Sequence, residues 1–151
     1  MSSFKDKYIQ KYAEKLADDG RKLINKAFLT ADFKKDKTQN LHDSYGCAVY
    51  YNRRLVFGTK RLLSPRANEP RYNKYSGQNE YGYNEINDFL DSYRPSGDGL
   101  VLVIAVAMFY GEILEKKKGS LKRKYNVISG VSSDIKALAD KYKGTVRDVN
   151  L

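Results

Sequence analysis

Ten consecutive apolar residues, LVLVIAVAMF at 100–109, limit the folds that this chain can adopt. A helix needs about 20 apolar residues to cross a bilayer, so the run is too short to be a membrane span. It is rich in β-branched valine and isoleucine, and the sequence GDG precedes it, so it predicts a strand. Because its apolar residues are continuous, we expect a central strand buried on both faces.

The segments around this strand predict helices and further strands. Apolar residues at helical spacing predict one long helix over 4–29. CAVYYNRRLVFG predicts a hairpin with strands at 47–51 and 54–58 and a turn at Asn52 and Arg53. LHDSYG predicts one helical turn before the hairpin, 108–119 a short helix, 124–129 a strand and 132–144 a final helix. The apolar stripe of the first helix is Phe4, Tyr8, Tyr12, Leu16, Leu23, Ala27 and Phe28.

This order of elements predicts a single α+β domain over residues 1–151. Its long N-terminal helix and its C-terminal helix pack on a small mixed or antiparallel sheet. Gly20 marks a close packing point or a bend in the long helix. The first helix is long for so small a domain, so its stripe either follows its own sheet or partly meets a neighbouring subunit. Alternation in the hairpin places Cys47 and Val49 on one face and Ala48 and Tyr50 on the other.

Residues 59–98 interrupt this pattern. They contain all three prolines of the chain and one short amphipathic helix, predicted at 84–93. An excursion of this length inside a small domain is typical of a binding loop or of a segment that a partner orders. We therefore expect a loop or arm that contacts a neighbouring subunit, and the alternative is a surface loop with a small helix. Subunit contacts would come from its aromatic residues, Tyr72, Tyr75, Tyr81, Tyr83, Phe89 and Tyr93.

The charge of the chain indicates a polyanionic partner. The formal net charge is +10, which is typical of proteins that bind nucleic acid or an anionic membrane. The N-terminal MSSFKDKYIQKYAEK is charged and has no apolar segment, so we expect no signal peptide. The densest basic segment is KKKGSLKRK, followed by a smaller group at the hairpin turn. The candidates for contact with DNA or with an acidic partner are Lys116, Lys117, Lys118, Lys122, Arg123, Lys124, Arg53 and Arg54. The alternative for 116–124 is a solvated turn.

The sequence offers few groups for catalysis. His42 is the only histidine and Cys47 the only cysteine, so sites that need several of either are excluded. We expect His42 to be a surface residue and Cys47 to be a small strand hydrophobe, and a Cys47–His42 pair is the alternative. Glu85, Asp88 and Asp91 share a helical face and could hold a divalent metal, although a solvated acidic face is the simpler interpretation. Neither GxGxxG nor GxxxxGK[ST] is present, so we expect a non-enzymatic protein without cofactors.

Three segments resemble a known family. The sequence KTQNLHDSYGCAVYYN resembles a T-G-N-L-x-x-S motif followed by a strand, found in the head–tail completion proteins of tailed bacteriophages (neck, minor tail or tail-terminator-like proteins). Thr38, Asn40, Leu41 and Ser44 match this motif, and Gln39 replaces its glycine. The runs VLVIAVAMFYGEILEKKKG and KYNVISGVSSDIKAL are similar to later strand and helix segments of the family. Tyr110, Glu115 and Gly119 roughly match the second of these motifs, which is longer here because of its lysines.

The resemblance implies a structural virion protein. Proteins of this family form a ring of six or twelve copies at the junction between portal and tail, around a channel for double-stranded DNA. The implied partners are other copies of the chain, adjacent portal, neck or tail ring proteins, and DNA bound without sequence specificity. The implied location is the virion neck, assembled in a bacterial host. The competing hypothesis is a monomeric protein that binds nucleic acid without sequence specificity.

Overall fold

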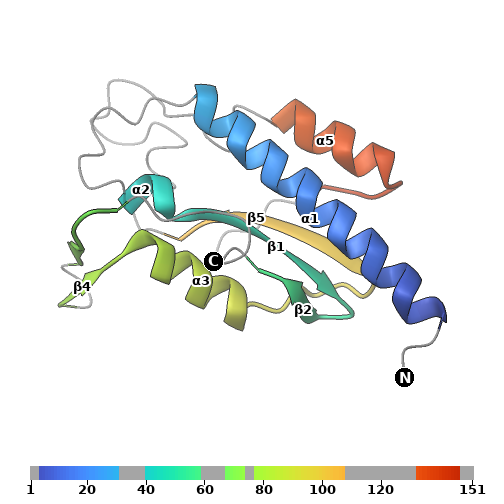
Figure 1. Cartoon of the computed structure of the whole chain (residues 1–151), viewed down its shortest axis with the longest axis horizontal. Coiled ribbons are helices and arrows are strands. Elements are labelled where there is room, and N and C mark those ends of the chain that lie inside the picture. Colours follow the sequence, from blue (N-terminus) through green and yellow to red (C-terminus); the bar gives the residue numbers. More distant parts are fainter. Residues whose placement is uncertain (1–3, 31–39, 59–66, 74–76, 108–131, 147–151) are drawn as a thin grey trace.

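The computed structural model describes residues 4–30, 40–58, 67–73, 77–107 and 132–146. Figure 1 shows an α+β fold, as predicted, in which helices cover a small antiparallel sheet. The predicted short helix at 108–119, the strand at 124–129 and the lysine-rich segment 116–124 lie outside the described residues. The elements are α1 (Phe4–Thr30), α2 (Asn40–Asp43), β1 (Tyr45–Tyr51), β2 (Arg54–Phe57), β3 (Arg71–Asn73), β4 (Gln78–Glu80), α3 (Gly82–Ser92), β5 (Leu100–Val106) and α5 (Ser132–Lys141).

The main sheet has the strand order β2-β1-β5, with both neighbours antiparallel to β1. The predicted hairpin is confirmed: Asn52 and Arg53 both have positive φ, 48° and 68°, as a type I′ turn requires. The apolar run forms a strand as predicted, but the expected burial on both faces is wrong, and its central position stays a prediction because the strand predicted at 124–129 lies outside the described residues. In the described sheet β5 pairs only with β1, and all seven of its residues are half-buried.

The central strand of the described sheet is β1, because a helix covers each of its faces. Helices α1 and α5 lie on one face and α3 on the other (Figure 1). Val49 packs with α1, whereas Ala48 and Tyr50 pack with α3, so the predicted alternation is confirmed. A strand with apolar contacts on both faces must be apolar throughout, and here YGCAVY is fully buried.

Helix α1 approaches the sheet through small residues. Its buried face contains Ala13, Ala17 and Gly20, together with Leu16 and Ile24. A Cβ atom at Gly20 would lie 2.8 Å from Leu102 Cδ1, which confirms the predicted close packing point.

The predicted apolar stripe of α1 is wrong at its N-terminal end. Tyr8 and Tyr12 are 53% and 39% exposed, because the small residues beside them, rather than the tyrosines, face the sheet. Their hydroxyl groups are 3.0 Å apart and within hydrogen-bond distance of each other.

Helix α5 is fastened to α1 mainly by polar contacts. Lys26 Nζ is 3.0 Å from Asp134 Oδ1, and the Tyr142 hydroxyl donates to Asp19 Oδ2 at 2.9 Å. Leu138 and Tyr142 also pack against the α1 side of the core, as predicted for the apolar face of this helix. The helix ends before Lys143, whose φ is 54°, and the N–H of Gly144 closes the end by donating to the carbonyl of Ala139.

Helix α3 confirms the short helix predicted at 84–93, but it belongs to the core, so the expectation of an arm over 59–98 is wrong for this part. Ile86 and Leu90 are completely buried against Ala48 and Tyr50. The buried Tyr50 hydroxyl donates to the carbonyl of Leu90 at 2.5 Å. The apolar residues of α3 thus cover the second face of β1. The β3–β4 hairpin lies at one end of the molecule (Figure 1).

Candidate functional site

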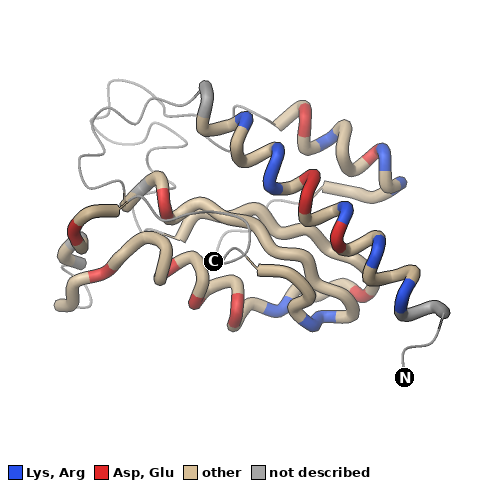
Figure 2. The backbone as a smooth tube through the Cα atoms, viewed as in Figure 1, with Lys and Arg blue, Asp and Glu red and all other residues tan. Residues whose placement is uncertain are grey.

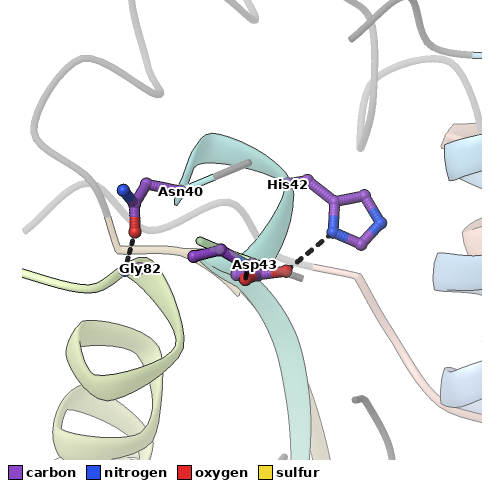
Figure 3. A network of polar contacts seen from close by, with 5 residues as sticks. Asn40, His42, Asp43 and Gly82 are labelled. Atoms are coloured by element: carbon purple, nitrogen blue, oxygen red, sulfur yellow. Dashed lines mark hydrogen bonds and ion pairs between the residues drawn. The ribbon is translucent and has the colours of Figure 1, made fainter. Parts of the chain in front are cut away.

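Four polar residues around α2 are almost completely buried. Asn40, His42, Asp43 and Ser44 are at most 6% exposed, and they form the buried polar cluster of the described residues. Buried polar groups are costly unless they are hydrogen-bonded, so such a cluster is either a structural tether or a reactive site. Figure 3 shows three of these side chains between the start of α3 and the start of β1.

The Asn40 side chain tethers α2 to two other segments. Its Oδ1 accepts a hydrogen bond from the N–H of Gly82 at 2.9 Å, and its Nδ2 donates to the carbonyl of Glu69 at 2.7 Å (Figure 3 shows the first). The N–H of Gly82 belongs to the first turn of α3, where backbone donors have no partner inside the helix. Asn40 therefore caps a helix from a segment forty residues away, and its role is structural.

His42 and Asp43 form a buried pair. His42 Nδ1 lies 2.9 Å from Asp43 Oδ1, and Asp43 Oδ2 accepts the N–H of Ala67 at 2.6 Å. The imidazole also packs on the ring of Phe28, with centroids 4.2 Å apart. The prediction that His42 is a surface residue is therefore wrong: it is 6% exposed and packs on Phe28 of α1.

A histidine held by a carboxylate is one half of a nucleophilic relay, and the Cys47–His42 pair is the alternative that the sequence leaves open. Cys47 is completely buried, on the face of β1 that packs against Gly20 of α1. Burial raises the pKa of its thiol to about 12, so the thiol is protonated at neutral pH and is not a nucleophile. Cys47 is thus the small strand hydrophobe that the sequence predicts.

The buried Cys47 thiol and the buried Tyr50 hydroxyl predict that the protein loses stability in alkali. Burial raises the pKa of Cys47 from an ordinary 9.0 and that of Tyr50 from 10.0, in both cases to about 12. Between pH 9 and 12 the folded state therefore holds protons that the unfolded state has lost. Their contribution to stability is complete below pH 9 and decreases as pH rises, by up to about 1.4 kcal/mol per pH unit for each group.

We expect urea unfolding at pH 8, 9.5 and 11 to show this decrease in the free energy of unfolding. Cys47→Ala should flatten the slope between pH 9 and 11. Equal slopes in the two proteins would contradict a role for the buried thiol.

The three acidic residues of α3 differ in their exposure. Glu85 is half-buried and Asp88 and Asp91 are exposed on this helix. Burial, then the nearby carboxylates of Glu80 and Asp88, raise the pKa of Glu85. No group of three or more potential metal ligands occurs in the part of the chain that the structure describes.

Of the predicted basic candidates, the structure describes Arg53 and Arg54, both exposed at the β1–β2 turn. Arg53 Nε is 3.4 Å from Asp98 Oδ1, so part of its charge is balanced within the chain. Lys116, Lys117, Lys118, Lys122, Arg123 and Lys124 lie outside the described residues.

The predicted subunit-contact residues have different environments. Tyr72 is 62% exposed on β3. The rings of Tyr81 and Tyr83 stack on each other, half-buried, with centroids 5.2 Å apart. Phe89 and Tyr93 stack at 5.3 Å and pack against the core on the α3 side. Tyr75 lies outside the described residues, and subunit contact by the others stays a prediction.

The structure adds one basic surface that the sequence analysis did not single out. Helix α1 carries a row of lysines on the side away from the sheet, Lys7, Lys11, Lys15, Lys22 and Lys26, here called the α1 lysine row. The signal is present in the sequence as spacings of four and seven residues, whereas the lysines at 116–124 form a cluster that is continuous in sequence. None of the helices in the described part of the chain combines the length and the apolar composition that crossing a bilayer requires.

The chain was compared with protein-family models, with curated proteins and with solved structures, and no significant match was found.

Proposed function

We propose that this chain is a structural virion protein that forms a ring in the neck of a tailed phage, around the channel through which DNA passes. The observation that carries the proposal is the position of its exposed tyrosines. Tyr8 and Tyr12 are on the N-terminal part of α1, and Tyr72 is on the β3–β4 hairpin. These two elements lie at opposite ends of the long axis of the molecule (Figure 1).

Two different exposed aromatic surfaces suit a ring. A closed ring is built from head-to-tail contacts, so each subunit needs two distinct complementary surfaces. Tyrosine is enriched where such contacts form, because its ring is apolar while its hydroxyl remains hydrogen-bonded. A monomer has no comparable need for exposed tyrosines at both ends.

The buried polar cluster also supports a structural role. Asn40 and Ser44 belong to the motif that resembles the head–tail completion family, and both are completely buried. The side chain of Asn40 accepts a hydrogen bond from the N–H of Gly82 in α3, and the carbonyl of Ser44 accepts one from the N–H of Ala107, just after β5. In this proposal the motif fixes the scaffold, and the chain has no enzymatic activity. The partners are other copies of the chain, adjacent neck, portal or tail rings, and double-stranded DNA.

Light scattering after size exclusion, followed by negative-stain imaging, tests the proposal. We expect closed rings of six or twelve copies. Tyr72→Ser, or Tyr8→Ser combined with Tyr12→Ser, should raise the concentration needed for assembly at least about tenfold, because aromatic anchors dominate interface energies. Val146→Ser is the matched control, since Val146 is equally exposed but outside both surfaces. A chain that stays monomeric at high concentration would overturn the proposal.

The α1 lysine row favours a second candidate, a monomeric protein that binds nucleic acid without sequence specificity. Its exposed lysines would bind phosphate groups in any sequence. Under this candidate the monomer binds duplex DNA with strong salt dependence, and the tyrosine substitutions change neither binding nor mass.

A further inference from the structure

The α1 lysine row covers one side of the helix. At 100° per residue, Lys7, Lys11, Lys15, Lys22 and Lys26 fall within an arc of about 100°, directly opposite the face that Ala13, Leu16 and Gly20 bury. From the first to the last lysine the row extends about 28 Å along the helix. All five side chains are exposed.

Most of this positive charge is not balanced by neighbouring carboxylates. Lys26 pairs with Asp134, but within the described residues no ion pair involves Lys7, Lys11, Lys15 or Lys22. Two nearby carboxylates have partners, because Asp18 pairs with Arg21, and Asp19 with Lys141 and the Tyr142 hydroxyl, whereas the exposed Glu14 offsets part of the charge of the row. The row thus has charge available for a molecule outside the chain.

The opposite side of the molecule carries the opposite charge. Helix α3 contains Glu85, Asp88 and Asp91 and no basic residue. Figure 2 shows blue positions spread along α1 and red positions on α3, which lies across the sheet. An approaching polyanion is therefore attracted to the α1 side and repelled from the α3 side.

Two molecules could bind the α1 lysine row: duplex DNA, or the acidic α3 face of a second copy. Their charge and length distinguish them. The α3 face of a second copy would offer three carboxylates to five lysines. Those three carboxylates extend only about 9 Å along their helix, whereas the lysine row extends about 28 Å. Duplex DNA presents one negative charge per about 1.7 Å of its axis, so it supplies charge along the whole row.

We propose that the α1 lysine row binds the phosphate backbone of double-stranded DNA without reading its sequence. The inference rests on the proposed function and deepens it, because it places α1 on the channel side of each subunit and α3 on the outer side. Lysine acts as a point charge on a flexible stem, so these contacts tolerate any base sequence and allow DNA to slide.

The test measures the binding of the full chain to a 30-base-pair duplex by fluorescence anisotropy between 50 and 200 mM salt. Lys11→Gln with Lys15→Gln should lower the slope of log K against log salt by about 2, since each lost phosphate contact removes about 0.9. Affinity at low salt should fall at least about tenfold. The matched control is Lys136→Gln with Lys143→Gln, which removes two exposed lysines on or just after α5 and should leave the slope close to that of the unaltered chain.

An unchanged slope in the α1 variant, or an equal loss of DNA affinity in both variants, would overturn the inference. So would an α1 variant that loses binding to phosphatidylserine vesicles, measured in parallel, but keeps its binding to DNA. Negative-stain imaging of the same proteins separates this inference from the proposed function. Rings whose DNA binding is unchanged by the α1 substitutions would contradict the inference about the lysine row and support the proposed ring. A monomer that loses DNA affinity only in the α1 variant would support the inference about the lysine row and contradict the proposed ring.

Discussion

Gly82→Ala is expected to unfold most of the protein or to reduce its free energy of unfolding by more than about 4 kcal/mol. Gly82 begins α3, and its α-carbon lies directly beneath the backbone of α2. A Cβ atom there would overlap the carbonyl oxygen of Asn40 and lie 3.0 Å from the backbone nitrogen of Ser44. Both neighbours are backbone atoms that cannot rotate away, so α3 would have to leave its place on the sheet.

Gly97→Ala is the matched control for this substitution. A Cβ atom at Gly97 has no neighbour within 4 Å, so the variant should unfold at the same urea concentration as the unaltered protein within experimental error. Circular dichroism during urea unfolding measures the free energy of unfolding of both variants. A Gly82→Ala protein that is as stable as the Gly97→Ala protein would show that α2 does not lie against the start of α3.

The elements that the sequence predicts correctly are those whose signal is local. The turn at Asn52 and Arg53, the long helix and the final helix follow from periodicity and turn chemistry alone. The burial of the strand at 100–106 was predicted wrongly because burial depends on neighbours. LVLVIAV is the more apolar sequence, yet YGCAVY is the buried strand, since helices from distant parts of the chain cover both of its faces.

The candidate surfaces show the same limit. Tyr8 and Tyr12 have the spacing of a core stripe, but the small residues Ala13 and Ala17 set which side of α1 meets the sheet. The burial of His42 could not be predicted either, because Phe28 packs on its ring from another helix and Ala67 bonds its partner Asp43 from a later segment. The α1 lysine row could have been found by its spacings of four and seven residues, whereas its charge balance depends on ion pairs with α5.

Leu90→Ala tests whether α3 belongs to the core. Leu90 is completely buried with Ile86 against Ala48 and Tyr50, so truncation removes apolar contacts and leaves a cavity. We expect the free energy of unfolding to fall by about 2–5 kcal/mol, as for other buried leucines. The carbonyl of Leu90 still accepts the Tyr50 hydroxyl in the variant, so the loss measures packing and not this hydrogen bond.

Asp88→Ala is the control on the same helix, two residues away but exposed to solvent. It should change stability by no more than about 0.5 kcal/mol, because it touches neither the core nor a described ion pair. Urea unfolding followed by tyrosine fluorescence compares the two variants at pH 7. If residues 82–92 formed an arm outside the core, both substitutions would have the same small effect, whereas a large loss in Leu90→Ala alone requires the helix to cover β1.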